Sequence, residues 1–328
     1  MSVGKMTSAQ LSAYQNAAAK YRKELLALPV IGLEEILPYA TLRMGVRYKE
    51  VVGNPSLGAQ FAPYKVDMKS ANDLSVDFRE LETFLGAVNL EFEPNSVASM
   101  IMGELAATKG EAMKDAQIAR EVLVQMAKDL AKTLNASIFS ASRNANGTTT
   151  ATLFNGFDTI TTSEITGGGL AVARKNFKQL DAAITAANAV AKLKELYRAA
   201  SPELRAAESV MLVSQDIMDA YNDNYETLHA ATPYNLQFEQ TFLEGSNNRC
   251  KLVALSSKSD SQYIHLTTKE NMLIGVDQLG DTENIEVARF SPFTLNFIAT
   301  MFFGVQFETL DARRLMVGKL AAAANGQS

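Results

Sequence analysis

The residues best suited to catalysis are few in this chain and far apart in the sequence. It contains one cysteine, Cys250, and two histidines, His229 and His265. A zinc site needs about four nitrogen, sulfur or oxygen ligands, usually with two of them closely spaced, and no such pair is present. A cysteine nucleophile normally acts with a histidine base, which only a residue distant in the sequence could supply. The sequence therefore predicts no catalytic residue and no metal site.

The two histidines have simpler structural interpretations. His229 ends a predicted helix over residues 216–229, where a partly exposed surface or interface position is expected. His265 lies in Tyr263-Ile264-His265-Leu266, an apolar stretch typical of a strand. A hydrogen-bonded position in the core and a position at the sheet edge both fit that stretch.

Two patterns that could bind ions are incomplete. Gly167-Gly168-Gly169 precedes a predicted helix, and a helix N-terminus can bind anions. No Lys-Ser/Thr pair follows, so the phosphate-binding lysine is missing, and a flexible joint between two units is expected instead. Four acidic residues without the alternate spacing of a calcium loop are interpreted as a solvated loop: Asp277, Asp281, Glu283 and Glu286. No cofactor is predicted.

Composition and charge narrow the class of protein. The chain has 328 residues, 47% hydrophobic and 20% charged, as in a globular protein of one large or several smaller domains. Lys and Arg number 31 against 36 Asp and Glu, a net charge of −5, which disfavours gripping nucleic acid or anionic lipid as the main function. No apolar run reaches the roughly 20 residues of a membrane helix. A secretory signal is not expected, and a single cysteine implies no internal disulfide.

Alternating segments near the N-terminus predict a long hairpin. A helix is expected over residues 10–27, followed by a strand over 43–51 and a second alternating stretch over 88–93. Residues 53–73 between them are rich in Gly, Pro, Asn and Asp, which favour turns. The two strands are interpreted as the stem of an antiparallel hairpin spanning about residues 43–93.

Opposite charges on the two arms suggest a register for this stem. Arg43, Arg47 and Lys49 lie on the first arm, and Glu91 and Glu93 on the second. If Arg47 lies opposite Asn89, Arg43 falls opposite Glu93. Such cross-strand pairs contribute only about 0.2–1 kcal/mol each but help to set register. The alternative is a pair of ordinary solvated faces within a compact sheet.

The rest of the chain mixes helices and strands. The longest predicted helix starts at Ser96, is weakened near Gly110 and continues to about residue 140. Leu123, Met126, Leu130 and Leu134 are expected to face a sheet. Further helices are predicted over 171–199 and 215–229 and a strand over 210–213. Later strands are expected near 251–256, 262–267, 272–276, 284–290 and 295–308, so the fold class is α+β.

The order of these parts resembles the major capsid proteins of tailed bacteriophages. A helical arm, a long charged hairpin, a long helix and a mixed α/β unit follow one another along the chain. Four short motifs agree with the corresponding segments of that family: Leu90-Glu91-Phe92-Glu93-Pro94, Ser209-Val210-Met211-Leu212-Val213-Ser214, Thr268-Lys269-Glu270-Asn271-Met272-Leu273-Ile274-Gly275-Val276-Asp277 and Phe302-Phe303-Gly304-Val305-Gln306. The resemblance covers essentially the whole chain, although each motif alone is weakly specific.

The resemblance implies a capsid-type fold with four parts. These are an N-terminal arm (1–42), an extended hairpin loop (43–93), a peripheral domain with a spine helix and sheet (94–150 and about 276–328), and a central mixed α/β axial domain (151–275). Subunits would contact each other through charged residues of the loop: Arg43, Arg47, Lys49, Lys65, Lys69, Glu91 and Glu93. Some members of the family cross-link a loop lysine to a neighbouring asparagine, and Lys65 and Lys69 would be the candidates here.

The implied function is a virion shell, made in the host bacterial cytoplasm. Copies of the chain would form hexamers and pentamers that close an icosahedral container around double-stranded DNA, without sequence-specific contacts and without a membrane. Separate scaffold and portal proteins would be further partners. The first alternative is an encapsulin-type compartment, which would share the fold and enclose protein. The second is a cytosolic enzyme or binding protein with a site built from scattered residues.

Overall fold

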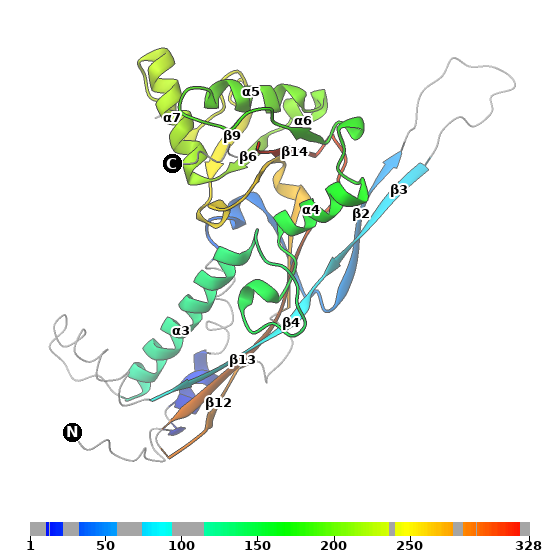
Figure 1. Cartoon of the computed structure of the whole chain (residues 1–328). Helices are drawn as coiled ribbons and strands as arrows, with labels where there is room; N and C mark the ends of the chain where they lie inside the picture. The colour runs from blue at the N-terminus through cyan, green and yellow to red at the C-terminus, as the bar shows by residue number, and fades with distance from the viewer. Residues whose placement is uncertain are drawn as a thin grey trace, which may run out of the picture.

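The molecule is elongated, with a mixed lobe of helices and strands at one end and long strands beside a long helix at the other (Figure 1). A two-stranded hairpin projects from the middle. The structure is a computed structural model. It describes residues 11–12, 14–21, 33–57, 74–93, 115–235, 240–277, 285–292 and 294–321.

The first sheet is built around one long strand, β13 (Leu295–Phe307). Along one side, β13 pairs with β11 (Met272–Asp277) near its C-terminal end and with β12 (Ile285–Arg289) near its N-terminal end. Along the other side it pairs with β4 (Phe84–Phe92), and all three pairings are antiparallel. β1 (Thr41–Met44) adds to β11 in parallel. The predicted strands at 272–276, 284–290 and 295–308 are confirmed.

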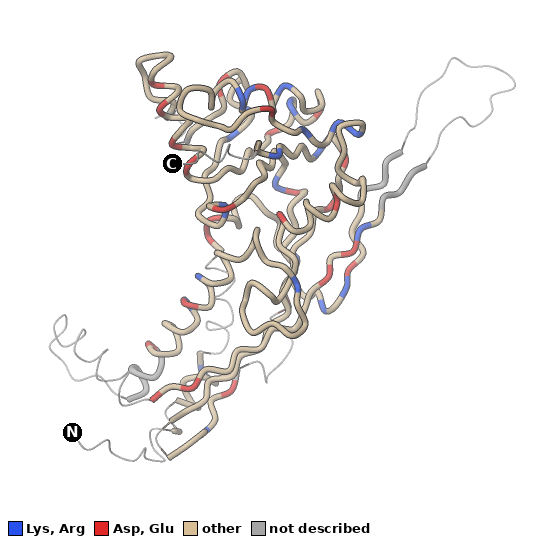
Figure 2. The backbone as a smooth tube through the Cα atoms, in the orientation of Figure 1, with Lys and Arg blue, Asp and Glu red and all other residues tan. Residues whose placement is uncertain are grey.

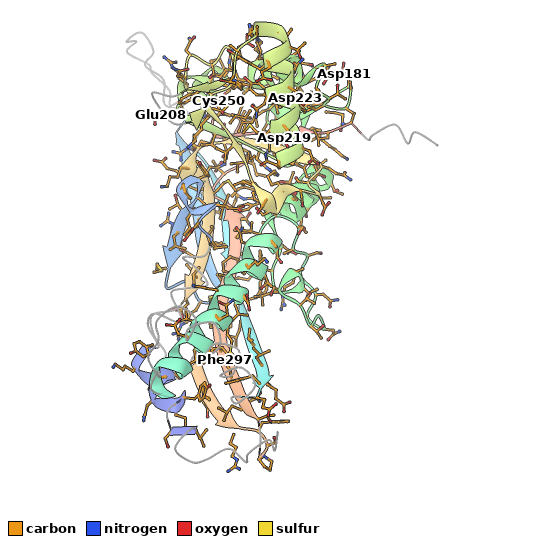
Figure 3. The ribbon with its side chains drawn as sticks, turned by 90° about the vertical axis from the view of Figure 1, so that its left-hand side faces the viewer. Asp181, Glu208, Asp219, Asp223, Cys250 and Phe297 are labelled. Atoms are coloured by element: carbon orange, nitrogen blue, oxygen red, sulfur yellow. The ribbon has the colours of Figure 1, made fainter. Side chains whose placement is uncertain are left out.

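The long helix α3 (Asp115–Ser137) lies along these strands (Figure 3). Residues 11–12 and 14–21 are also helical. Side chains of both helices pack with Phe297 of β13 in one apolar cluster. The predicted stripe on α3 is only partly right, because Leu123 and Leu134 are buried whereas Met126 and Leu130 are half-buried. Helix geometry instead buries the small residues Ala127 and Ala131 between the two leucines. The predicted start at Ser96 lies outside the described residues.

The second sheet forms the centre of the lobe. Its strand order is β5-β14-β10-β6-β9, with β5 on β14 and β6 on β9 parallel and the other two pairings antiparallel. The strands are β5 (Phe177–Gln179), β6 (Ser209–Val213), β9 (Cys250–Ala254), β10 (Tyr263–Thr267) and β14 (Leu315–Lys319). The strands predicted at 210–213, 251–256 and 262–267 are confirmed, and β5 and β14 were not predicted.

Four helices surround or adjoin this sheet: α4 (Phe157–Gly167), α5 (Ala189–Ala199), α6 (Pro202–Ala206) and α7 (Gln215–His229). Ser201 and Ser214 begin α6 and α7, each accepting a hydrogen bond from a backbone N–H of the first turn. Short elements complete the chain: η1 (Leu37–Tyr39), η2 (Thr150–Thr152), η3 (Val172–Arg174), η4 (Ser256–Lys258), η5 (Lys269–Asn271), β7 (Tyr234–Asn235) and β8 (Gln240–Thr241).

The predicted helix over residues 171–199 is wrong in its first half. That half forms η3 and β5, and only the second half is helical, as α5. The buried Asn176 side chain bonds the backbone at Gly169, Ala171 and Leu310, which fixes the chain for pairing with β14. The glycine run therefore ends α4, and the short 3-10 helix η3 follows it in place of the predicted long helix. Gly168 takes the left-handed conformation, with φ +76°, that commonly terminates a helix.

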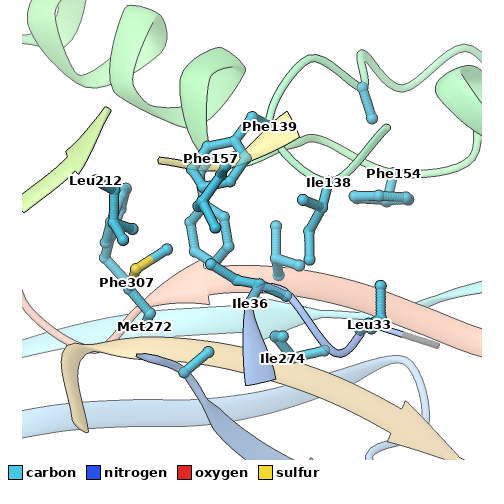
Figure 4. Packing of buried hydrophobic residues seen from close by; sticks show 14 of the residues in the cluster. Leu33, Ile36, Ile138, Phe139, Phe154, Phe157, Leu212, Met272, Ile274 and Phe307 are labelled. Atoms are coloured by element: carbon cyan, nitrogen blue, oxygen red, sulfur yellow. The ribbon is translucent and has the colours of Figure 1, made fainter. Parts of the chain in front are cut away.

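The largest apolar cluster joins the two sheets (Figure 4). Phe139, which follows α3, packs on Phe157 of α4, and Phe157 packs on Phe307 of β13. Leu212 of β6 and Met272 of β11 belong to the same cluster. The long strands and the lobe therefore share one core.

The projecting hairpin consists of β2 (Lys49–Leu57) and β3 (Leu74–Glu82). The predicted stem of residues 43–51 with 88–93 is wrong, since β4 pairs with β13. The alternation over 43–51 conceals a break, because Gly45 and Tyr48 have positive φ values of 80° and 66° and separate β1 from β2. Residues 53–57, predicted as turn, continue the strand, and residues 58–73 lie outside the described ranges.

Candidate subunit interface

The predicted interface residues lie at different places. Arg43 is exposed on β1, in register with Gly275 of β11, and does not lie opposite Glu93. Glu91 pairs in register with Asn296 near the far end of β4, and its Oε1 accepts a hydrogen bond from Thr294 Oγ1 at 2.7 Å. The proposed pairing of the two arms is therefore wrong. The half-buried Glu93 follows β4.

Arg47 is bound to the body of the subunit. Its guanidinium Nε donates to the carboxylate of Asp277 at the end of β11. Asp277 is 6% exposed, so its interpretation as part of a solvated loop is wrong. Of the other acidic residues in that group, Glu286 is exposed and Asp281 and Glu283 lie outside the described residues. Sequence alone gave no signal that a residue of β11 faces Arg47.

Lys49 takes part in a charge network within the hairpin. Its Nζ lies 2.8 Å from Glu80 and 2.5 Å from Glu82, and these carboxylates raise the pKa of the lysine. All three side chains are substantially exposed, so the network adds little to subunit stability. Figure 2 shows acidic and basic residues interleaved along this part of the hairpin. Lys65 and Lys69 lie outside the described residues.

One face of the hairpin exposes large apolar side chains. The register pairs Lys49 with Glu82, Val51 with Glu80 and Gly53 with Phe78, so these residues share what we call the outer hairpin face. Val51 is 63% and Phe78 71% exposed on it. Val52 and Leu81 point to the opposite side and are 6% and 0% exposed. This face was not predicted from the sequence, because the predicted strand boundaries and register were wrong.

A groove of about 430 Å³ lies between α3, β4, β13 and the loop after α3. Its lining includes Leu85, Leu130, Leu153 and Met301, and Arg143 is the one charged residue in it. It contains no histidine, cysteine or carboxylate that could act as an acid, base or nucleophile. The groove therefore offers an apolar contact surface.

Several polar side chains of the lobe form a buried, hydrogen-bonded cluster around His265. His265 Nδ1 lies 3.1 Å from Lys258 Nζ, and His265 Nε2 lies 3.0 Å from Thr161 Oγ1. Lys258 Nζ also donates to Ser261 Oγ and contacts Asp158 Oδ1 at 3.4 Å. Both Lys258 and His265 are completely buried, and burial lowers the pKa of each. His265 therefore occupies a hydrogen-bonded core position, one of its two predicted environments.

The remaining residues suited to catalysis are separated from this cluster. Cys250 is buried on β9, beyond β6 in the strand order, and burial raises the pKa of its thiol to about 12. His229 is half-exposed at the end of α7, as predicted, and contacts Glu244 at 3.2 Å. The described residues contain no group of three His, Cys, Asp or Glu side chains arranged to hold a metal ion. No helix in the described ranges is both long and apolar enough to cross a membrane.

Comparison with known proteins gives a likeness of fold. No protein-family model matches the sequence, and no curated protein matches it. A chain of the satellite phage P4 procapsid structure, which includes the size determination (Sid) protein, aligns over 92% of this chain and 92% of its own length, with 10% identity and a TM-score of 0.58. A chain from the capsid of a native GTA particle aligns over 88% of this chain and 91% of its own, with 12% identity and a TM-score of 0.54.

The chain has a capsid-shell fold. The α+β class and the capsid-type fold predicted from the sequence are thereby confirmed. A chain of the holo-SrpI encapsulin complex from Synechococcus elongatus PCC 7942 also aligns, over 89% of each chain, with 9% identity and a TM-score of 0.50. The capsid-shell fold thus occurs in both kinds of particle, and function depends on which surfaces and contents a given chain adds to it.

Proposed function

We propose that this chain is the major capsid protein of a tailed phage or prophage. It assembles as hexamers and pentamers into an icosahedral shell around double-stranded DNA. The observation that carries the proposal is the whole-length likeness to phage and GTA capsid chains, together with the apolar outer hairpin face. The protein is made in the host bacterial cytoplasm and ends in the virion capsid.

The four parts expected from the sequence become roles in this proposal. Residues 1–42 act as an N-terminal arm and 43–93 as the extended loop. Residues 94–150 and about 276–328 form the peripheral domain, in keeping with α3 beside the long strands, except that β14 within this range pairs into the sheet of the lobe. Residues 151–275 form the axial domain around which subunits of a hexamer or pentamer meet, in keeping with the second sheet and its helices.

The hairpin is the proposed contact with a neighbouring subunit. A two-stranded hairpin is marginally stable in water unless another surface covers it. Val51 and Phe78 are uncovered in the single subunit, and burying each would contribute about 1.5–3 kcal/mol. A second copy supplies that cover, with Arg43, Lys49, Lys65 and Lys69 as charged contacts around it. Glu91 and Glu93 contribute from the other end of β4.

Removing the outer part of the hairpin tests this contact. Leu57 and Leu74 form the last described cross-strand pair, so residues 58–73 can be replaced by a two-residue Asn-Gly turn. We expect the subunit to melt at a nearly unchanged temperature while shell formation fails, as measured by calorimetry and electron microscopy. A variant with residues 58–73 in scrambled order controls for length. Regular particles from the deletion variant would exclude residues 58–73 from assembly, and unfolding would show that the subunit needs them to fold.

The net charge of −5 suits enclosure of DNA without sequence-specific contacts, because each phosphate contact would add salt-sensitive binding. Scaffold and portal proteins are separate partners in this proposal.

An encapsulin-type shell is the second candidate, favoured by the likeness to the holo-SrpI encapsulin chain. The contents of purified particles separate the two. A phage shell protects DNA from added nuclease, whereas an encapsulin shell releases protein cargo and no protected DNA when it is opened.

A further inference from the structure

Arg79 is a nearly buried cation at the base of the hairpin. It lies on β3, in register with Val52, and its side chain is 14% exposed. Nε donates to the carbonyl oxygen of Phe307 at 3.1 Å, and Nη2 donates to Glu164 Oε1 at 2.7 Å and to Gln306 Oε1 at 3.0 Å. One hairpin side chain therefore binds the end of β13 and helix α4 together.

Glu164 is placed to receive this cation. It lies in the last turn of α4, where the helix dipole disfavours a carboxylate, and that turn contains no basic residue. A Cβ on Gly169 would stand 2.2 Å from Glu164 Oε2, so the glycine leaves room for the carboxylate. Arg79 supplies from the hairpin the positive charge that the end of α4 lacks.

The position of Arg79 is as informative as its contacts. Leu81, two residues nearer the body on the same face as Arg79, is 0% exposed, whereas Phe78 on the opposite, outer hairpin face is 71% exposed. A pocket of about 330 Å³, lined by both hairpin and α4 residues, lies beside Arg79. Val52 and Leu81 pack on Leu273 of β11, whereas the pocket separates the hairpin from α4, and the bonds of Arg79 cross that separation.

Gln306 strengthens the same bridge. Its Nε2 donates to the carbonyl oxygen of Glu80 at 3.0 Å while its Oε1 accepts from Arg79. The end of β13 thus bonds both the backbone of β3, at Glu80, and a side chain of β3, that of Arg79. A lysine at position 79 would offer a point charge on a flexible stem, whereas the planar guanidinium bonds three acceptors in fixed directions.

We propose that Arg79 is a positioning residue that fixes the direction in which the hairpin leaves the subunit. Its bonds to Glu164, Gln306 and Phe307 act as a clamp at the point where the hairpin emerges. The consequence for assembly rests on the proposed shell function, because a hairpin held in one direction meets its neighbour at one angle. The clamp itself is a property of the single subunit.

The test measures hairpin direction in unassembled subunits. Spin labels are attached to cysteines introduced at Ser75 on β3 and at Asp219 on α7, and the distance between them is measured by pulsed electron resonance. Cys250 needs no replacement because it is buried and its pKa is raised. We expect one narrow distance peak in the parent protein and a broad distribution in Arg79→Ala and Glu164→Gln, with melting temperatures that change little.

The matched control is Lys49→Gln, which removes a hairpin cation whose partners Glu80 and Glu82 belong to the hairpin itself. The peak should stay narrow in this control. The double variant Arg79→Glu, Glu164→Arg, which restores opposite charges, should recover part of the narrow peak, and Arg79→Lys should recover less than the parent. An unchanged narrow peak in Arg79→Ala overturns the proposal, and so does equal broadening in Lys49→Gln.

Particle formation by the same variants is scored separately by electron microscopy. The Arg79→Ala variant could give a broad distance distribution while the parent protein forms no particles. That result would support the clamp and contradict the proposed shell. Normal particles from a subunit with a broad distribution would show that the clamp does not control assembly.

Discussion

At the scale of single residues, the buried cluster around His265 makes the subunit sensitive to acid. The imidazole lies between Lys258 and Thr161 with no exposed surface, beside the ring of Phe307. Protonating it would place a second positive charge 3.1 Å from the Lys258 ammonium nitrogen in a site of low polarity. The neutral form is therefore the form that the fold accepts.

The free energy of unfolding should decrease as the pH is lowered, because of this histidine. Its pKa is lowered well below the ordinary value of 6.5, so the unfolded chain binds a proton at a higher pH than the folded chain does. The stabilising contribution is complete above pH 6.5 and is lost as pH falls toward the folded pKa, by at most about 1.4 kcal/mol per pH unit. Denaturant unfolding of His265→Gln between pH 7 and 5 should give a shallower decline than the parent. Identical slopes would show that His265 does not cause the decline.

The ion-pair partners of the charged residues were the part of the candidate site that was hardest to predict from the sequence. Asp277 faces Arg47 and Glu164 faces Arg79 across long separations in the chain. Alternation identifies charged positions on a strand, but it does not say which distant element lies opposite them. Local features carried more information, as the predicted exposure of His229 at the end of a helix shows.

At the scale of elements, the periodicity of the sequence predicted where strands lie better than which strands pair. The strands from β9 to β13 alternate or run as continuous apolar stretches, and their positions were predicted closely. The predicted hairpin stem was wrong because a nearly continuous alternation of polar and apolar residues hid the break in the chain between Gly45 and Tyr48. The helix predicted over 171–199 was wrong in its first half. The alanine content of that half favours a helix, whereas the Asn176 hydrogen bonds and the pairing with β14 fix an extended chain. Tertiary contacts overrode local propensity there.

The buried side of α3 can be tested with two leucines one helical turn apart. Leu134 is 3% exposed, so Leu134→Ala should lower the free energy of unfolding by about 2–5 kcal/mol. Leu130 is half-buried at the edge of the groove, and Leu130→Ala should cost clearly less. Denaturant titration of unassembled subunits measures both. Equal costs would mean that the helix presents a different side to the sheet.

The close approach of β13 to the end of the hairpin depends on Gly304. A Cβ at this position would lie 2.0 Å from the carbonyl oxygen of Glu82, which belongs to the backbone and cannot move aside cheaply. Gly304→Ala should therefore destabilise the subunit by about 1–3 kcal/mol. Gly167→Ala is the control, because nothing lies within 4 Å of its Cβ and it is helical. Equal melting temperatures for the two variants would contradict the close approach.

At the scale of the whole molecule, the fold leaves surfaces that a single subunit does not cover. The hairpin projects from an elongated body (Figure 1). Its outer face exposes Val51 and Phe78. The apolar groove beside α3 lies on the long-strand part of the same subunit. In the proposed shell, copies of the chain that pack side by side would bury these surfaces.

The most direct test of the proposed shell is electron microscopy of the purified protein over a range of concentrations, with the particle mass measured in parallel. We expect hollow closed particles, or rings of five and six subunits, in which every subunit is an intact folded chain. A folded protein that remains monomeric throughout the micromolar range would contradict it.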